Sequence, residues 1–212
     1  MTTASIIQLL DLHGDDLIVG ERSTSRIALI LTAETGLPIQ ASQLTSLKLS
    51  LSLRDDTSLP ALGINGVLGV DILNTGRGTI GNEKTVIAGS LTADYAVRLR
   101  VTNHGYSSGD LVAVRNVIGL RGANGDWPIT VIDNDWIELQ ASLGSGTWSS
   151  GGDVVKGLHL TLLPADNVIV DPTGIAIGET EWHTATIVAV YNTTSQFPME
   201  VQYQVANLGL II

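Results

Sequence analysis

The stretch SLKLSLSLR, residues 46–54, decides the class of fold. Leucine occupies every second position, and the residues between are serine, lysine and arginine. Successive side chains of a β-strand point to opposite faces, whereas a helix repeats every 3.6 residues. The stretch therefore predicts a strand with a buried leucine face and a polar outer face, as in an antiparallel sheet that is covered on one side.

The same alternation recurs along much of the chain. It is seen in residues 26–32, 95–102, 110–117, 127–133, 136–140, 158–163, 183–191 and 199–205. Runs rich in glycine, asparagine, aspartate and proline separate these segments, for example residues 33–38, 74–82 and 121–126. Residues 5–12 fit a helix or a strand, and no segment sustains a helical period. Many short strands with frequent turns predict an all-β fold, a sandwich or a barrel.

Composition narrows the classes of partner. Hydrophobic residues make up 44% of the 212 residues but aromatic residues only 4%, which predicts a core of leucine, isoleucine and valine. The net charge is −10 and the 11 basic residues are scattered, so we expect no nucleic acid partner. The absence of cysteine excludes disulfides and thiolate chemistry. No secretory signal is evident and no apolar run approaches about 20 residues, so we expect no membrane partner.

Composition also changes along the chain. Trp127, Trp136 and Trp148 and most of the short glycine-rich turns fall between residues 94 and 155, while the flanking parts are rich in leucine, isoleucine and threonine. We therefore predict a compact β-module at 94–155. It would be inserted into a larger discontinuous β-sandwich made of 1–93 and 156–212.

Residues 101–155 resemble the FCCH-type β-module, which is named after the first catalytic-cysteine half-domain of ubiquitin-activating enzymes and recurs in bacteriophage structural proteins. The matching features are His104-Gly105, Ser108-Gly109-Asp110, Asn124-Gly125 before Trp127, the strands at 129–133 and 137–140, and Ser150-Gly151-Gly152. The resemblance implies a small barrel without a catalytic cysteine. In it Gly109-Asp110 would end a turn, Asn124-Gly125 would supply a positive φ, and Gly151-Gly152 would turn the last strand back.

The flanking parts resemble the immunoglobulin-like sandwich of tailed-phage virion proteins. The residues that carry this resemblance are 14–17, 35–39, 44–55, 70–80 and 160–171, with a strand containing Glu181 and His183 before a final hairpin. Together the two resemblances imply a discontinuous immunoglobulin-like β-sandwich with an inserted small β-barrel module.

The stretch HGYSSGD, residues 104–110, holds the residue types of a Ser-His-Asp hydrolase: His104, Ser107, Ser108 and Asp110. Side chains within one tight turn seldom reach that geometry, and no strand–turn–helix elbow presents a serine. We predict instead that the serines and Asp110 bond to backbone groups of the turn and that His104 terminates a strand. The sequence predicts no catalytic residue and no enzyme.

Two acidic patterns are candidates for a metal site. Glu179, Glu181 and His183 alternate, so one strand face would carry oxygen and nitrogen ligands, but no second histidine lies nearby in sequence. We predict a polar strand side that faces solvent or an interface. The acidic pairs in residues 14–16 and 133–136 do not continue into a calcium loop and are predicted to be turn residues. We expect neither a metal nor a cofactor.

The resemblances imply a non-enzymatic structural component of a bacteriophage virion. A head-associated decoration or minor capsid protein is favoured, docking on other virion proteins as a homo-oligomer or in a symmetric array. A tail, baseplate or fibre-attachment protein is an alternative within the same class. In either role the apolar residues 207–212 are expected to pack on the sandwich or on a neighbouring subunit.

A carbohydrate-binding or adhesion module is an alternative from another class, with Trp127, Trp136 and Trp148 as stacking residues. It needs at least two exposed indoles beside a groove. The strand pattern instead places Trp127 and Trp136 in the core of the module.

Overall fold

The computed structural model describes residues 5–9, 18–33, 35–54, 63–171, 174–191 and 195–209. It confirms the all-β prediction, because the helical structure in these ranges is limited to two short 3-10 turns, η1 (Ala41–Gln43) and η2 (Ile64–Gly66). No helix in the described ranges is long and apolar enough to cross a membrane. Residues 5–9, which fit either a helix or a strand, form a strand.

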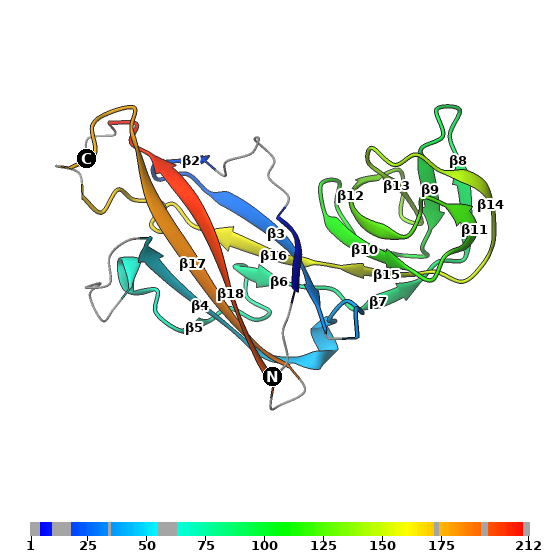
Figure 1. The fold of residues 1–212 in the computed structure, drawn as a ribbon, viewed down its shortest axis with the longest axis horizontal. Coiled ribbons are helices and arrows are strands. Elements are labelled where there is room, and N and C mark those ends of the chain that lie inside the picture. Colours follow the sequence, from blue (N-terminus) through cyan, green and yellow to red (C-terminus); the bar gives the residue numbers. More distant parts are fainter. Residues whose placement is uncertain are drawn as a thin grey trace.

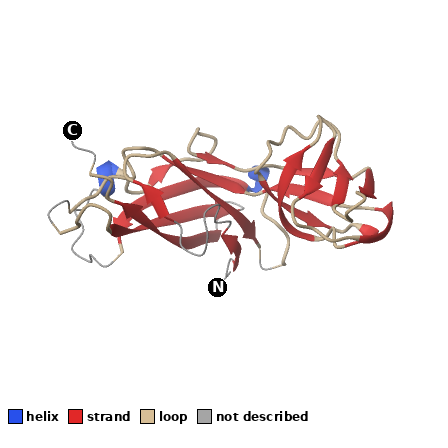
Figure 2. Cartoon of the chain, turned by 90° about the horizontal axis from the view of Figure 1, so that it is seen from above, coloured by secondary structure: helices blue, strands red, loops and turns tan. Residues whose placement is uncertain are grey.

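The strands divide between two bodies that lie side by side along the molecule (Figures 1 and 2). The larger body contains β1 (Ser5–Leu9), β2 (Ile18–Gly20), β3 (Ser25–Thr32), β4 (Leu44–Leu53), β5 (Val70–Asp71), β6 (Gly78–Thr79), β16 (Leu158–Leu162), β17 (Thr180–Tyr191) and β18 (Ser195–Ala206). The smaller body contains β7 (Glu83–Thr85), β8 (Ala88–Leu91), β9 (Val97–Arg100), β10 (Leu111–Arg115), β11 (Ile118–Arg121), β12 (Gly125–Val131), β13 (Trp136–Leu139), β14 (Ser145–Ser150) and β15 (Asp153–Lys156).

The larger body is a sandwich of two sheets. One sheet has the strand order β1-β3-β16-β6, and the other has the order β2-β18-β17-β4-β5. One hydrophobic cluster draws residues from both sheets, among them Leu29 and Leu160 from the first and Leu49, Ile187 and Val201 from the second. The two sheets therefore bury their apolar faces against each other, as sheets in a β-sandwich do.

The leucine strand behaves as its sequence predicts. Leu47, Leu49 and Leu51 of β4 are fully buried, and Lys48 is exposed. Leu49 lies opposite Ile187 in the antiparallel pairing of β4 with β17. A register shift of one residue would turn every leucine toward solvent, so the alternation also fixes the register.

The smaller body is a curled sheet with its own core. Its strand order is β7-β15-β10-β12-β13-β9-β8, and β11 and β14 form a separate two-stranded ribbon. The sheet bends into a half-barrel (Figure 1). Its hydrophobic cluster is drawn from residues 86–154 and contains Val97, Leu99, Val112, Ile129 and Ile137. We call this body the module.

A packed junction connects the module to the sandwich. Ala28 and Ile30 on the outer face of β3 form a small buried cluster with Leu111 and Ala113 of β10. Gly157 alone separates β15 from β16, and a Cβ atom at this position would lie 2.5 Å from the carbonyl oxygen of Leu29. The chain passes between the two bodies with no room for a side chain at that point. The junction therefore orients the module by close packing.

Candidate functional site

His104 is a buried structural residue at the start of the HGYSSGD turn. It is 3% exposed, and its ring stacks on Tyr106 with a centroid distance of 5.0 Å. Its Nε2 lies 2.8 Å from the carbonyl oxygen of Asp133, and its Nδ1 lies 2.9 Å from the backbone nitrogen of Tyr106. A carbonyl only accepts and an N–H only donates, so the ring is neutral with its proton on Nε2. Both ring nitrogens are thus engaged in backbone hydrogen bonds.

The side chain of Asp110 bonds to the backbone of the turn, as the sequence predicts, while that of Ser108 bonds to the neighbouring strand β12. The hydroxyl oxygen of Ser108 accepts the N–H of Val131 at 2.8 Å. The carboxylate of Asp110 accepts the N–H of Ser107 at 2.9 Å, and Gly109 takes the positive φ that the turn requires. The structure therefore does not assemble the nucleophile, base and orienting acid of a hydrolase from these residues.

Asp110 lies beside two residues that sequence reasoning missed, Lys156 of the module and His159 of the sandwich. Its side chain lies 2.7 Å from the Nζ of Lys156 and 3.7 Å from the Nε2 of His159. The same Nε2 accepts the backbone N–H of Leu111 at 3.3 Å, which makes His159 neutral. Burial lowers the pKa of His159, and Lys156 and Arg26 act in the same direction while Asp110 opposes them. No local sequence signal joins residues this far apart.

The alternating Glu179, Glu181 and His183 do not form the exposed polar face that the sequence predicts. Glu181 and His183 lie on the core face of β17, where His183 is fully buried, while Glu179 lies in the turn before the strand. Glu181 accepts the N–H groups of Val170 and Asp171, and its Oε1 lies 2.7 Å from the Nε2 of His183. These three partners satisfy the oxygens of the Glu181 carboxylate, so a charged group is tolerated at this buried position.

Hydrogen bonds also set the protonation state of Glu181. Burial acts to raise its pKa, but the hydrogen bonds from His183, Val170 and Asp171 outweigh it and hold the pKa below its ordinary value. Within the described ranges, no group of three or more histidine, aspartate or glutamate side chains is placed to hold a metal ion.

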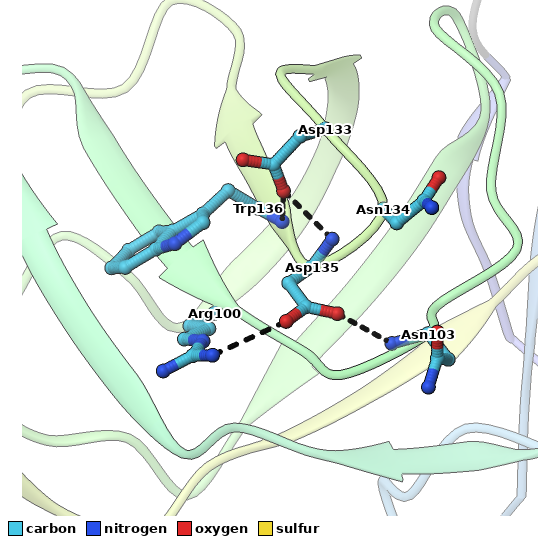
Figure 3. Close-up of a pocket in the computed structure, with 6 residues that line it drawn as sticks. All are labelled: Arg100, Asn103, Asp133, Asn134, Asp135 and Trp136. Carbon is cyan, nitrogen blue, oxygen red and sulfur yellow. Dashed lines mark hydrogen bonds and ion pairs between the residues drawn. The ribbon is translucent and has the colours of Figure 1, made fainter.

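A shallow depression on the module is the candidate site (Figure 3). Its volume is about 610 Å³. It lies where β9 ends and where the β12–β13 hairpin turns. The residues that line it are Arg100, Asn103, Asp133, Asn134, Asp135 and Trp136.

Two carboxylates hold the wall of this depression rigid. Asp133 Oδ1 accepts the N–H groups of Asp135 and Trp136 at 2.8 and 2.9 Å, so residues 133–136 form a turn as predicted. Asp135 accepts the N–H of Asn103 at 3.0 Å and pairs with Arg100 Nη2 at 3.2 Å (Figure 3). The N–H of Asn103 and the guanidinium of Arg100 lower the pKa of Asp135. The other predicted acidic turn, residues 14–16, lies outside the described residues.

The platform of three tryptophans that the carbohydrate-binding alternative requires is not formed by Trp127, Trp136 and Trp148. Trp127 and Trp148 pack against the core of the module and donate their indole N–H groups to the carbonyl oxygens of Ala123 and Gly151. Trp136 lines the depression, so the prediction that it is buried in the core is wrong. The reason is the alternation of β13: Ile137 and Leu139 point into the interior of the half-barrel, so Trp136 lies on the outer face.

The Asn124-Gly125 pair supplies the positive φ that was predicted, because Gly125 has a φ of +156°. Asn124 acts through its side chain. Its amide accepts the N–H of Val117 and donates to the carbonyl oxygen of the same residue, each at 2.9 Å. A Cβ atom at Gly125 would lie 2.9 Å from the indole nitrogen of Trp127, so glycine is required there by close approach.

Comparison with known proteins adds no family: no family model matches the chain, and no curated protein matches it significantly. The buried carboxylates and histidines described above are engaged in internal hydrogen bonds and ion pairs that hold turns and contact the junction. The depression around Trp136 offers polar and aromatic groups on a fixed wall, which suits non-covalent binding.

Proposed function

We propose that this protein is a non-enzymatic structural component of a bacteriophage virion. The observation that carries the proposal is the junction: two β-bodies with separate cores are joined by buried contacts between β3 and β10 and by a linker that has no space for a side chain at Gly157. Such a junction presents one body at a fixed angle from the other. This is the property required of a protein that anchors on a particle and projects a module from it. The resemblances to FCCH-type and immunoglobulin-like virion modules support the same role.

Both bodies carry exposed apolar side chains suited to docking. Tyr95 and Leu143 of the module are 63% and 78% exposed, and the carbonyl of Tyr95 accepts the N–H of Gly144 next to Leu143. Ile177 and Leu208 of the sandwich are 76% and 54% exposed. Leu208 lies close to Gly20 of β2. Since exposed apolar side chains that lie together mark protein–protein contact sites, we assign docking to these two places.

Within the virion, the head-associated role is the leading proposal, as a decoration or minor capsid protein in many copies. A tail, baseplate or fibre-attachment role is the alternative. The two roles differ in copy number, because a shell repeats its parts far more often than a tail does.

Density-gradient purification of particles from a lysate of the producing phage tests this proposal. An antibody against the chain should detect it in the particle band, and it should remain there after a high-salt wash. Particles that lack the chain should take up recombinant protein. These particles should take up less of the double variant Ile177→Ser/Leu208→Ser. They should take up Leu68→Ser, which changes an exposed leucine elsewhere on the sandwich, as they do the parent protein. A chain found only in the soluble fraction overturns the proposal.

A further inference from the structure

The outer face of the half-barrel carries a row of side chains around Trp136. Trp136 lies opposite Arg100 on β9, which in turn lies opposite Ala88 on β8. Ile132, which is 45% exposed, donates its backbone N–H to the carbonyl of Trp136. Side chains of directly opposed residues in antiparallel strands share one face. The half-buried indole thus sits between an aliphatic side chain and a guanidinium.

Two side-chain amides line the same depression without a partner of their own. Asn103 and Asn134 are both exposed, and neither amide hydrogen-bonds to another group in the part of the chain that the structure describes. In Figure 3, Trp136 and Arg100 lie to one side of Asp135, and the two asparagines lie to the other. The depression therefore combines one aromatic surface with amide donors and acceptors that are free to bind a ligand.

The backbone that carries these groups is held in place before any ligand arrives. His104 donates from Nε2 to the carbonyl of Asp133, and its backbone N–H donates to the carbonyl of Asn134. Asp133 and Asp135 fix the turn from within. A wall that does not have to be ordered on binding loses less affinity to conformational entropy.

We propose that this depression binds a neutral saccharide, with one pyranose ring against the indole of Trp136 and hydroxyl groups on Asn103, Asn134 and Arg100. A pyranose has an apolar C–H face and a rim of hydroxyls that both donate and accept, which matches an aromatic surface beside amides and a guanidinium. Anionic ligands are disfavoured because Asp133 and Asp135 line the depression and Arg100 already pairs with Asp135. The proposal does not depend on the chain being a virion protein.

The shape of the site sets the expected affinity. The depression is open and has a single aromatic side chain, so most of a bound sugar stays in contact with water. Such a site gives a Kd of about 1 mM, and tighter binding to a surface requires several copies of the protein acting together. If the chain is arrayed on a particle, that condition is met.

The four indole N–H signals in a proton–nitrogen NMR spectrum of the full chain provide a direct test. Titration with methyl glycosides of glucose, galactose and mannose and with N-acetylglucosamine should shift the Trp136 signal saturably for at least one sugar. The signals of Trp127, Trp148 and Trp182 should stay in place. Asn134→Ala should weaken binding about 5-fold to 10-fold, as expected for one lost hydrogen bond. Ile118→Ala, at an exposed position of the module away from the depression, should bind as the parent does.

Three outcomes would overturn the proposal. One is the absence of a saturable shift at Trp136 up to about 50 mM of every sugar, well above the expected Kd. A second is equal affinity of the parent and Asn134→Ala. A third is a saturable shift with inorganic phosphate or N-acetylneuraminic acid alone, which would assign the depression to anions. Because Asn134 is exposed and its side chain has no partner in the described structure, a folding defect would not account for its loss of binding.

Discussion

Replacing Asp110 by alanine tests how strongly this buried carboxylate stabilises the module beside the junction. The side chain is about as buried as a core residue, with 5% exposed, and it accepts the N–H of Ser107 at 2.9 Å while pairing with Lys156 at 2.7 Å. Removing one member of a fully buried ion pair costs about 3–5 kcal/mol. Lys156 retains 22% exposure and the N–H of Ser107 is near solvent, so both can regain water contacts. We therefore expect Asp110→Ala to lower the free energy of unfolding by about 2–3 kcal/mol.

Guanidinium unfolding at pH 7, followed by circular dichroism and tryptophan fluorescence, measures this loss. Asp94→Ala is the matched control, because Asp94 is exposed in the same module and should change stability by less than about 0.5 kcal/mol. The double variant Asp110→Ala/Lys156→Met should be more stable than the sum of its single changes predicts, since it leaves no unpaired ammonium group. If Asp110→Ala were as stable as Asp94→Ala, the hydrogen bond to Ser107 and the ion pair with Lys156 would not contribute to stability.

Three further predictions concern stability. Burial lowers the pKa of His159 below the 6.5 of the unfolded chain, so the unfolded state binds more protons, and stability should be full above pH 6.5 and fall as the pH drops below it. The urea midpoint of the parent should therefore fall between pH 7.5 and pH 5, and that of His159→Gln should fall less steeply. An equal fall in both proteins would contradict this. Asn124→Ala leaves both backbone groups of Val117 unpaired and should lower the free energy of unfolding in denaturant by about 1–3 kcal/mol. Asn124→Asp keeps the acceptor and should lower it by less. An equal decrease for the two variants would rule out the paired hydrogen bonds. Leu49→Ala should lower stability by about 2–5 kcal/mol by the same measurement, since Leu49 is fully buried, and a loss under about 0.5 kcal/mol, as for a surface site, would mean that β4 does not face the core.

The strand pattern was predictable because burial on one face imposes a period of two. Leu47, Leu49 and Leu51 show this directly, and the alternation alone placed them in the core. The turn at 104–110 was predictable for a similar reason, since Ser107 and Asp110 are close in sequence and bond locally.

The remaining features depend on contacts between distant residues, which no local pattern encodes. Lys156 and His159 reach Asp110 because β10 pairs with β15 and the chain then continues into β16. Glu181 is buried because the loop before β17 supplies two N–H groups to it. The outward position of Trp136, by contrast, follows from the local alternation of β13, in which Ile137 and Leu139 point inward. The depression as a whole required the three-dimensional arrangement.

The copy number of this chain in purified virions tests most directly whether it is a structural part of a phage particle. Mass spectrometry with isotope-labelled peptides of the chain and of the major capsid protein gives this ratio. We expect a fixed ratio of this chain to the major capsid protein in washed particles. It should correspond to hundreds of copies for a head-associated protein and to on the order of three to twelve copies for a tail or baseplate component. A chain that is absent from washed particles, or present in amounts that vary between preparations, would contradict it.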